Sequence, residues 1–116
     1  MAKTILIVGQ VVNIALASAG YEVIEAVDGV DALTKLDGRK IHLIISDVNM
    51  PNMDGITLVK EIKQKADYKF TPIIMLTTES QDDMKAQGQA AGARAWVVKP
   101  FQPAQMLAAV SKLIAP

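Results

Sequence analysis

Five short segments that read as strands, most of them almost wholly apolar, restrict most strongly the fold that this sequence can adopt. A short apolar run without polar alternation is typical of a strand that is buried on both faces, as in a parallel sheet. We therefore predict strands at Thr4–Val8, Tyr21–Ala26, Ile41–Ser46, Ile73–Thr77 and Ala95–Val98. Apolar residues recur at helical spacing after each run, which predicts helices over 11–19, 30–36, 56–62, 80–92 and 103–114.

Strand and helix thus alternate five times, and repeated strand–helix units build one parallel sheet with helices on both faces. We expect an α/β fold with a five-stranded parallel sheet. The chain of 116 residues contains no repeat, linker or low-complexity segment, so we expect one domain over residues 1–116.

Composition excludes several classes of function. Lys and Arg together number 12, as do Asp and Glu, so the charge pattern predicts no nucleic-acid and no membrane partner. Cysteine is absent, which excludes disulfides and thiolate metal sites and fits a cytoplasmic protein. The single histidine, His42, is interpreted as a strand residue. The first 20 residues, ending in Ala17-Ser18-Ala19-Gly20, also resemble a secretory signal, the less favoured alternative.

Polar residues follow three of the predicted strands, at the edge where ligands bind in open α/β sheets. Asp47 follows the third strand, Thr77 ends the fourth, and Lys99 follows the fifth. A carboxylate can attack phosphorus, a hydroxyl can donate to a phosphoryl oxygen, and a lysine supplies positive charge. Each residue alone also fits an ordinary turn, strand or loop position. Together they indicate a phosphoryl site.

Three segments, in this order and at these intervals, resemble the bacterial response-regulator receiver domains. Residues 47–55 resemble the phosphoacceptor loop, residues 77–79 the switch-threonine segment, and residues 96–101 the lysine–proline segment. The resemblance covers residues 1–8 and 11–116. It is closest to the single-domain, CheY-like chemotaxis regulators, and it implies a flavodoxin-like (βα)5 fold and a signalling module that is not an enzyme.

The resemblance also assigns the phosphoacceptor and the metal ligands. Asp47 would accept phosphate from a partner histidine kinase in a two-component phosphorelay. Asp47 and the backbone carbonyl of Asn49 would be ligands of Mg²⁺.

The other roles implied by the resemblance concern the switch. Thr77 would bind the phosphoryl group and report phosphorylation by its movement, and Lys99 would pair with the phosphoryl oxygens. The bond between Lys99 and Pro100 is cis in the family. Trp96 stands where relatives have a mobile aromatic residue that couples the site to an output face for a downstream target. Trp96 is equally well interpreted as a partly buried residue of an edge strand.

The sequence departs from the family directly after the first strand. Relatives have two acidic residues there, whereas this chain continues Val8-Gly9-Gln10-Val11. The pair is absent, together with part of the first loop and helix. Mg²⁺ prefers oxygen ligands that include carboxylates, so we expect weak or absent Mg²⁺ binding and impaired phosphorylation. Glu25 and Asp28 are not expected to replace the pair.

Gly9 and Gln10 leave a very short connection to a shortened first helix. Most strand-to-helix loops need about two to six residues, and shortened hinges favour domain swapping. We expect a homodimer with a swapped N-terminal segment as one outcome. The missing residues lie at a single place in the chain, which also suggests an engineered loop deletion.

Three rival functions follow from other classes of protein. A binding or assembly module that works without phosphate is favoured by the missing acidic pair. A flavodoxin-like cofactor binder needs a longer phosphate loop after the first strand than Gly9-Gln10 provides. A hydrolase would need a nucleophile elbow, which is not visible in the sequence.

Overall fold

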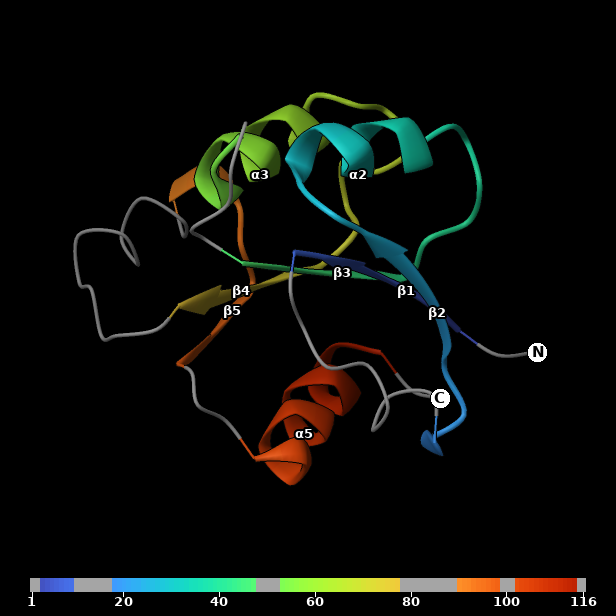
Figure 1. Ribbon diagram of the computed structural model, residues 1–116, viewed down its shortest axis with the longest axis vertical. Helices are drawn as coiled ribbons and strands as arrows, with labels where there is room; N and C mark the ends of the chain where they lie inside the picture. Colours follow the sequence, from blue (N-terminus) through green and yellow to red (C-terminus); the bar gives the residue numbers. More distant parts are fainter. Residues whose placement is uncertain (1–2, 10–17, 48–52, 78–89, 99–101, 115–116) are drawn as a thin grey trace.

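The computed structural model describes residues 3–9, 18–47, 53–77, 90–98 and 102–114, and its described elements form one sheet with helices on both sides. The strands are parallel, and their order is β2-β1-β3-β4-β5 (Figure 1). The elements are β1 (Thr4–Val8), β2 (Glu22–Ala26), α2 (Gly29–Lys35), β3 (Leu43–Asp47), α3 (Gly55–Lys63), β4 (Ile73–Thr77), β5 (Ala95–Val98) and α5 (Pro103–Leu113).

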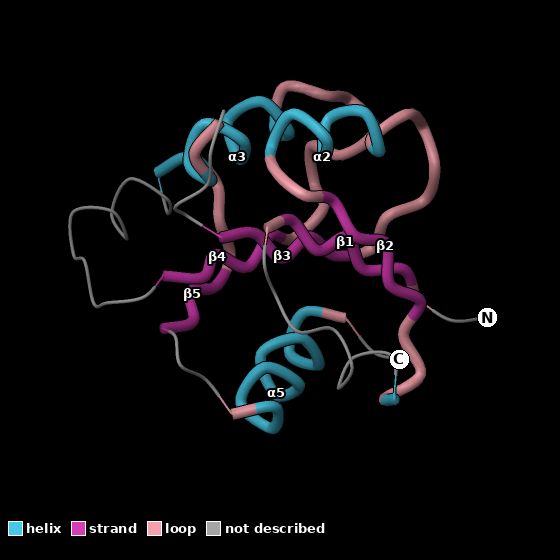
Figure 2. Tube along the Cα trace, in the orientation of Figure 1, coloured by secondary structure: helices cyan, strands magenta, loops and turns pink. Residues whose placement is uncertain are grey.

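This arrangement confirms the predicted five-stranded parallel sheet with helices on both faces. Helices α2 and α3 lie on one face and α5 on the other (Figure 2). The first predicted helix falls largely within 10–17 and the fourth largely within 78–89, so both lie mostly outside the described residues.

The third strand begins later than predicted. Ile41 and His42 precede β3, which runs from Leu43 to Asp47. His42 is bound to the start of β1 instead: its backbone N–H donates to the carbonyl oxygen of Thr4 at 2.8 Å, and its Nδ1 accepts from the N–H of Thr4 at 2.9 Å. The interpretation of His42 as a strand residue was therefore wrong, because an apolar run indicates burial and not the strand boundary.

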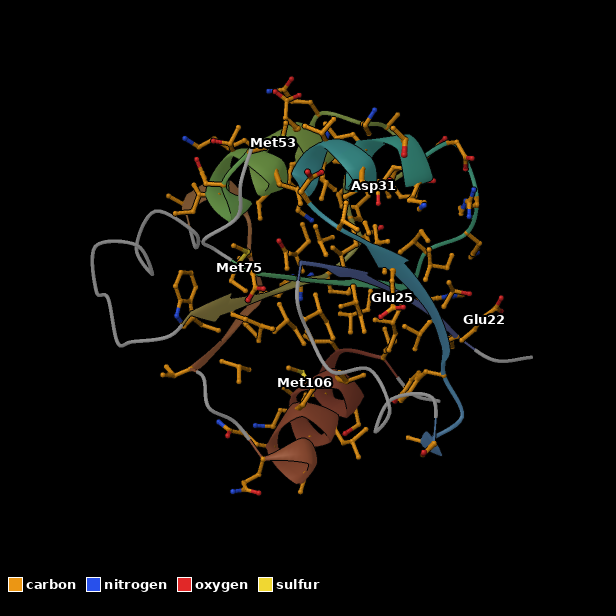
Figure 3. The ribbon with its side chains drawn as sticks, in the orientation of Figure 1. Glu22, Glu25, Asp31, Met53, Met75 and Met106 are labelled. Atoms are coloured by element: carbon orange, nitrogen blue, oxygen red, sulfur yellow. The ribbon has the colours of Figure 1, made fainter. Side chains whose placement is uncertain are left out.

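Alternate residues of each strand pack on opposite faces of the sheet, which divides the core into two layers. Ile44 and Met75 pack toward α2 and α3, whereas Ile45 and Leu76 pack toward α5. Figure 3 shows Met75 and Met106 on opposite sides of the sheet. Burial on both faces explains why the central strands β1, β3 and β4 are almost wholly apolar, whereas the edge strand β2 carries the exposed Glu22 and Glu25.

Two helices begin at aspartates that satisfy N–H groups of the first turn. Asp28 accepts from the N–H of Asp31 at 2.8 Å, and Asp54 accepts from the N–H of Thr57 at 2.8 Å. The hydrogen bond from Thr57 is the main cause that lowers the pKa of Asp54. At α5, Gln102 makes no side-chain cap. None of the helices in the described ranges is long and apolar enough to cross a membrane.

Candidate functional site

Asp47 is the last residue of β3, a central strand, at the carboxyl edge of the sheet. Its exposed fraction is only 5%. The register pairs Asp47 with Leu76, and Thr77 follows as the last residue of β4, paired with Val98 of β5. The strand ends therefore bring the backbones of Asp47, Thr77 and Val98 to one edge, where ligands bind in open α/β sheets.

Gly9 lies directly against the carboxylate of Asp47. A Cβ atom built on Gly9 would be 2.7 Å from Oδ2 of Asp47 and 3.2 Å from its Cβ, so any side chain at this position would force Asp47 or the backbone to shift. The φ of Gly9 is +93°, a conformation that glycine adopts readily. Its N–H donates to the carbonyl oxygen of Ala26 at 2.9 Å, which extends the pairing between β1 and β2 beyond Val8. The backbone of Gly9 thus occupies space beside the carboxylate.

The other predicted site residues are described to different extents. The backbone of Thr77 is placed, and its side chain lies outside the described part. Asn49, Lys99 and Pro100 lie outside the described residues altogether, so their predicted roles as metal ligand, phosphoryl partner and cis peptide stay predictions.

Trp96 is partly buried on the edge strand β5 and packs against the core layer under α2 and α3. Its indole Nε1 is buried and finds no acceptor among the described residues. A buried polar group without a partner has a free-energy cost. Trp96 also lines a cavity of about 400 Å³ with Arg94 and residues of α5.

Of the two predicted magnesium ligands, Asp47 lies in the described part of the structure and Asn49 does not. No three His, Cys, Asp or Glu side chains converge within the described ranges. Glu25 is exposed on β2 and Asp28 caps α2, so neither is shown to replace the acidic pair. Mg²⁺ is usually held by one or two carboxylates with further oxygens. Asp47 and the backbone of Gly9 do not make up such a set.

Sequence reasoning missed the contact between Gly9 and Asp47. The two residues are far apart in sequence, and the only signal was a glycine immediately after a buried strand. That signal predicted a break in the strand, but it did not indicate which side chain would lie against the glycine.

Comparison with known families identifies the chain. The response regulator receiver domain family matches residues 6–111. The chain therefore belongs to the response regulator receiver domain family, a class of signalling modules of two-component systems.

Relatives agree with this assignment. The chain is 40% identical to the chemotaxis protein CheY1 of Helicobacter pylori over 81% of the chain and 77% of that protein. It is 36% identical to the phosphate regulon transcriptional regulatory protein PhoB of Pseudomonas aeruginosa over 97% of the chain. That match covers 52% of PhoB, so the chain spans about half of that relative's length.

Solved structures show the same fold. The chemotaxis protein CheY4 of Vibrio cholerae matches with a TM-score of 0.93 and 41% identity, over 98% of this chain and 100% of that one. The receiver domain of the sensor histidine kinase PA1611 of Pseudomonas aeruginosa matches with a TM-score of 0.88 and 26% identity, over 100% of both chains. Magnesium is coordinated in the active site cleft of that receiver domain.

Proposed function

We propose that this receiver domain accepts a phosphoryl group on Asp47 from a partner histidine kinase, and that the transfer is impaired. The supporting observation is a carboxylate at the carboxyl end of the central strand β3, in a fold that matches the receiver family. Residues 1–116 would act as one cytoplasmic module of a chemotaxis-type relay.

The proposed reaction transfers the phosphoryl group without net redox change. A carboxylate oxygen of Asp47 attacks the phosphorus of the kinase phosphohistidine. The P–N bond breaks, its electron pair stays on the imidazole nitrogen, and that nitrogen takes up a proton. The product is an acyl phosphate on Asp47. Thr77 and Lys99 would bind its oxygens, and Thr77 and Trp96 would carry the change to an output target.

The impairment rests on what lies beside Asp47. The backbone of Gly9 occupies this position, and it supplies no carboxylate. Transfer of a phosphoryl group needs positive charge where negative charge gathers. If Mg²⁺ binds weakly through Asp47 and Asn49 alone, this charge is largely missing and the transfer is slow.

Incubation with acetyl phosphate and Mg²⁺ tests the proposal, with intact-mass spectrometry to count phosphoryl groups. We expect slow labelling that Asp47→Asn abolishes and that Asp67→Asn, at an exposed carboxylate, leaves unchanged. Labelling of Asp47→Asn would contradict the assigned acceptor. A saturable response of Trp96 fluorescence to Mg²⁺, with rapid labelling, would show that the site is intact and not impaired.

The second candidate is a binding or assembly module that works without phosphate. The missing acidic pair favours this candidate, because relatives have two acidic residues directly after the first strand and this chain has Gly9 there. A short connection after β1, whether natural or an engineered deletion, would let the N-terminal segment pack into a second copy. Sedimentation of the wild-type chain tests this candidate: a dimer with no acetyl phosphate reactivity supports it, and a monomer at high concentration contradicts the swap.

A further inference from the structure

A cavity distinct from the one beside Trp96 lies at the opposite end of the sheet from Asp47. Its volume is about 460 Å³, within the usual range of small-molecule sites of about 300–1,000 Å³. The cavity lies before β3 and β4, and it is lined by residues 38–42, 66–68 and 70–72. Because Asp47 ends β3, roughly 13 Å of extended strand separate the cavity from the phosphoacceptor.

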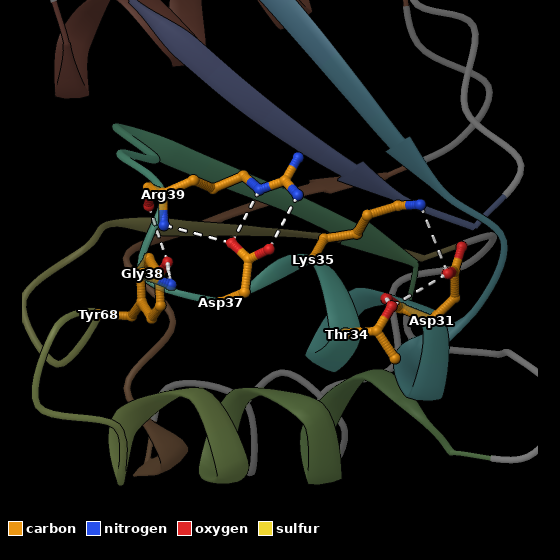
Figure 4. A network of polar contacts seen from close by, with 7 residues as sticks. All are labelled: Asp31, Thr34, Lys35, Asp37, Gly38, Arg39 and Tyr68. Carbon is orange, nitrogen blue, oxygen red and sulfur yellow. Dashed lines mark hydrogen bonds and ion pairs between the residues drawn. The ribbon is translucent and has the colours of Figure 1, made fainter.

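Hydrogen bonds hold the two walls of this cavity together. The hydroxyl of Tyr68 donates to the carbonyl oxygen of Arg39 at 2.7 Å and accepts from the N–H of Gly38 at 2.9 Å (Figure 4). Within the second wall, the ammonium of Lys63, a residue of α3 that does not line the cavity, donates to the carbonyl oxygens of Lys69 and Thr71 at 3.1 and 2.7 Å. A site fixed in this way loses little conformational entropy when a ligand binds.

One wall of the cavity offers N–H donors. His42 accepts at Nδ1 from Thr4, so its neutral ring carries the proton on Nε2, and this N–H has no partner among the described residues. Lys40 is exposed and forms no ion pair with them. Arg39 uses Nε and Nη2 to bind Asp37, which leaves Nη1 available (Figure 4).

Positively charged side chains predominate around this wall. Burial is the main cause that lowers the pKa of His42, and the charges of Lys3 and Lys40 lower it further. Around the whole cavity the cations outnumber the two carboxylates, Asp37 and Asp67. Lys3, Arg39 and Lys40 lie at this wall, and Lys69 lies beside Phe70 on the other.

The other wall carries an exposed aromatic ring. Phe70 lines the cavity and is 84% exposed, the highest fraction among the large hydrophobic side chains that the structure describes. The ammonium of Lys69 lies 5.6 Å from the centroid of its ring. An exposed ring is a stacking surface for a planar group, and the adjacent cation favours a ligand that also carries negative charge.

We propose that this cavity binds a nucleoside phosphate, with the phosphate against Lys40, Arg39 and Nε2 of His42 and the base on Phe70. A nucleoside monophosphate combines the anion and the planar ring that the two walls require, and it fits the volume. Asp47 does not line this cavity, so the proposed ligand would not contact the proposed phosphoacceptor.

Titration of the full chain with AMP tests this proposal, by calorimetry and by amide chemical shifts. We expect saturable binding with shifts at residues 38–42 and 66–72. Lys40→Ala should weaken binding about tenfold by removing a phosphate contact. Phe70→Ala should weaken it about tenfold by removing the stacking surface. Lys60→Ala removes an exposed cation outside the cavity and should leave binding unchanged.

Circular dichroism checks the fold of each variant, and Phe70→Tyr, which keeps the ring, should bind like the wild type. Absence of binding by AMP would overturn the proposal, as would wild-type affinity in both Lys40→Ala and Phe70→Ala. Inorganic phosphate that binds as tightly as AMP would overturn the role of Phe70. Adenosine that binds as tightly as AMP would overturn the anion site.

Discussion

The two ends of the sheet both use a glycine in the left-handed region, but the surroundings of the two glycines differ. Gly9, at the carboxyl end, has a φ of +93°, and Gly38, at the amino end, has a φ of +103°. A Cβ atom on Gly9 would meet the carboxylate of Asp47, whereas a Cβ atom on Gly38 would have no neighbour within 4 Å. The backbone requirement is the same at both ends, and only the carboxyl end adds a packing requirement.

Replacing each glycine with alanine separates the backbone requirement from the packing requirement. These two variants have the largest expected effect on stability. Gly38→Ala should lower the free energy of unfolding by about 1–2 kcal/mol, because only backbone strain is added. Gly9→Ala should cost a further ~1–3 kcal/mol, because the methyl group displaces Asp47 or the end of β1. Urea unfolding of both variants measures the difference.

The Asp47→Ala background is the control for this comparison. Part of the extra cost of Gly9→Ala should disappear there, since the nearest carboxylate oxygen is gone, and a double-mutant cycle measures the coupling. Equal costs for the two glycine variants would show that Gly9 and Asp47 are not in contact.

The amino end depends on the hydroxyl of Tyr68, which joins the segments before β3 and β4. Tyr68→Phe keeps the ring and removes two hydrogen bonds, so the free energy of unfolding should fall by about 1 kcal/mol. The matched control is Tyr21→Phe, because the hydroxyl of Tyr21, also a buried residue, has no hydrogen bond to the described residues. A similar loss in both variants would mean that the Tyr68 hydrogen bonds do not stabilise the amino end.

At the carboxyl edge, Asp54 caps the first turn of α3. Asp54→Ala removes the hydrogen bonds to Thr57 and should cost about 1 kcal/mol, whereas Gln102→Ala, at a helix without a side-chain cap, should cost little. The pKa of Asp54 is lowered in the folded state, so its contribution is present above the unfolded pKa and is lost as pH falls. A wild-type advantage over Asp54→Ala that does not shrink in acid would contradict this role.

The smallest expected effect is a titration at the amino end. The side-chain hydrogen bond from Arg39 is the largest cause that lowers the pKa of Asp37 from 3.8 to about 2. Arg39→Ala should return the pKa of Asp37 toward 3.8, as measured by NMR titration of its carboxyl carbon, and Lys40→Ala should not. The favourable interaction between Arg39 and ionised Asp37 exists above about pH 4 and is lost as the pH falls through the folded-state pKa of Asp37. An unchanged pKa in Arg39→Ala would show that the pair does not persist in solution.

The order and approximate position of every described strand and helix could be predicted from the sequence. Apolar runs and helical spacing predicted β1, β4 and β5 at the residues where they occur, because burial on both faces demands continuous apolar strands. The same reasoning placed Asp47 at the carboxyl edge of the sheet. The roles of Asn49, Thr77, Lys99 and Pro100 came from resemblance to the family and stay predictions.

The contacts at the two ends of the sheet could not be predicted from the sequence, because they form only in the folded chain. The tertiary structure set Gly9 against Asp47, and it joined Gly38 and Arg39 to Tyr68, about 30 residues further along the chain. Periodicity records which face of an element is buried, but contacts between loops depend on strand order and register. The sequence around a loop glycine or tyrosine does not indicate which residue it will contact. The contact of Gly9 with Asp47 and the cavity before β3 and β4 are therefore visible only in the folded chain.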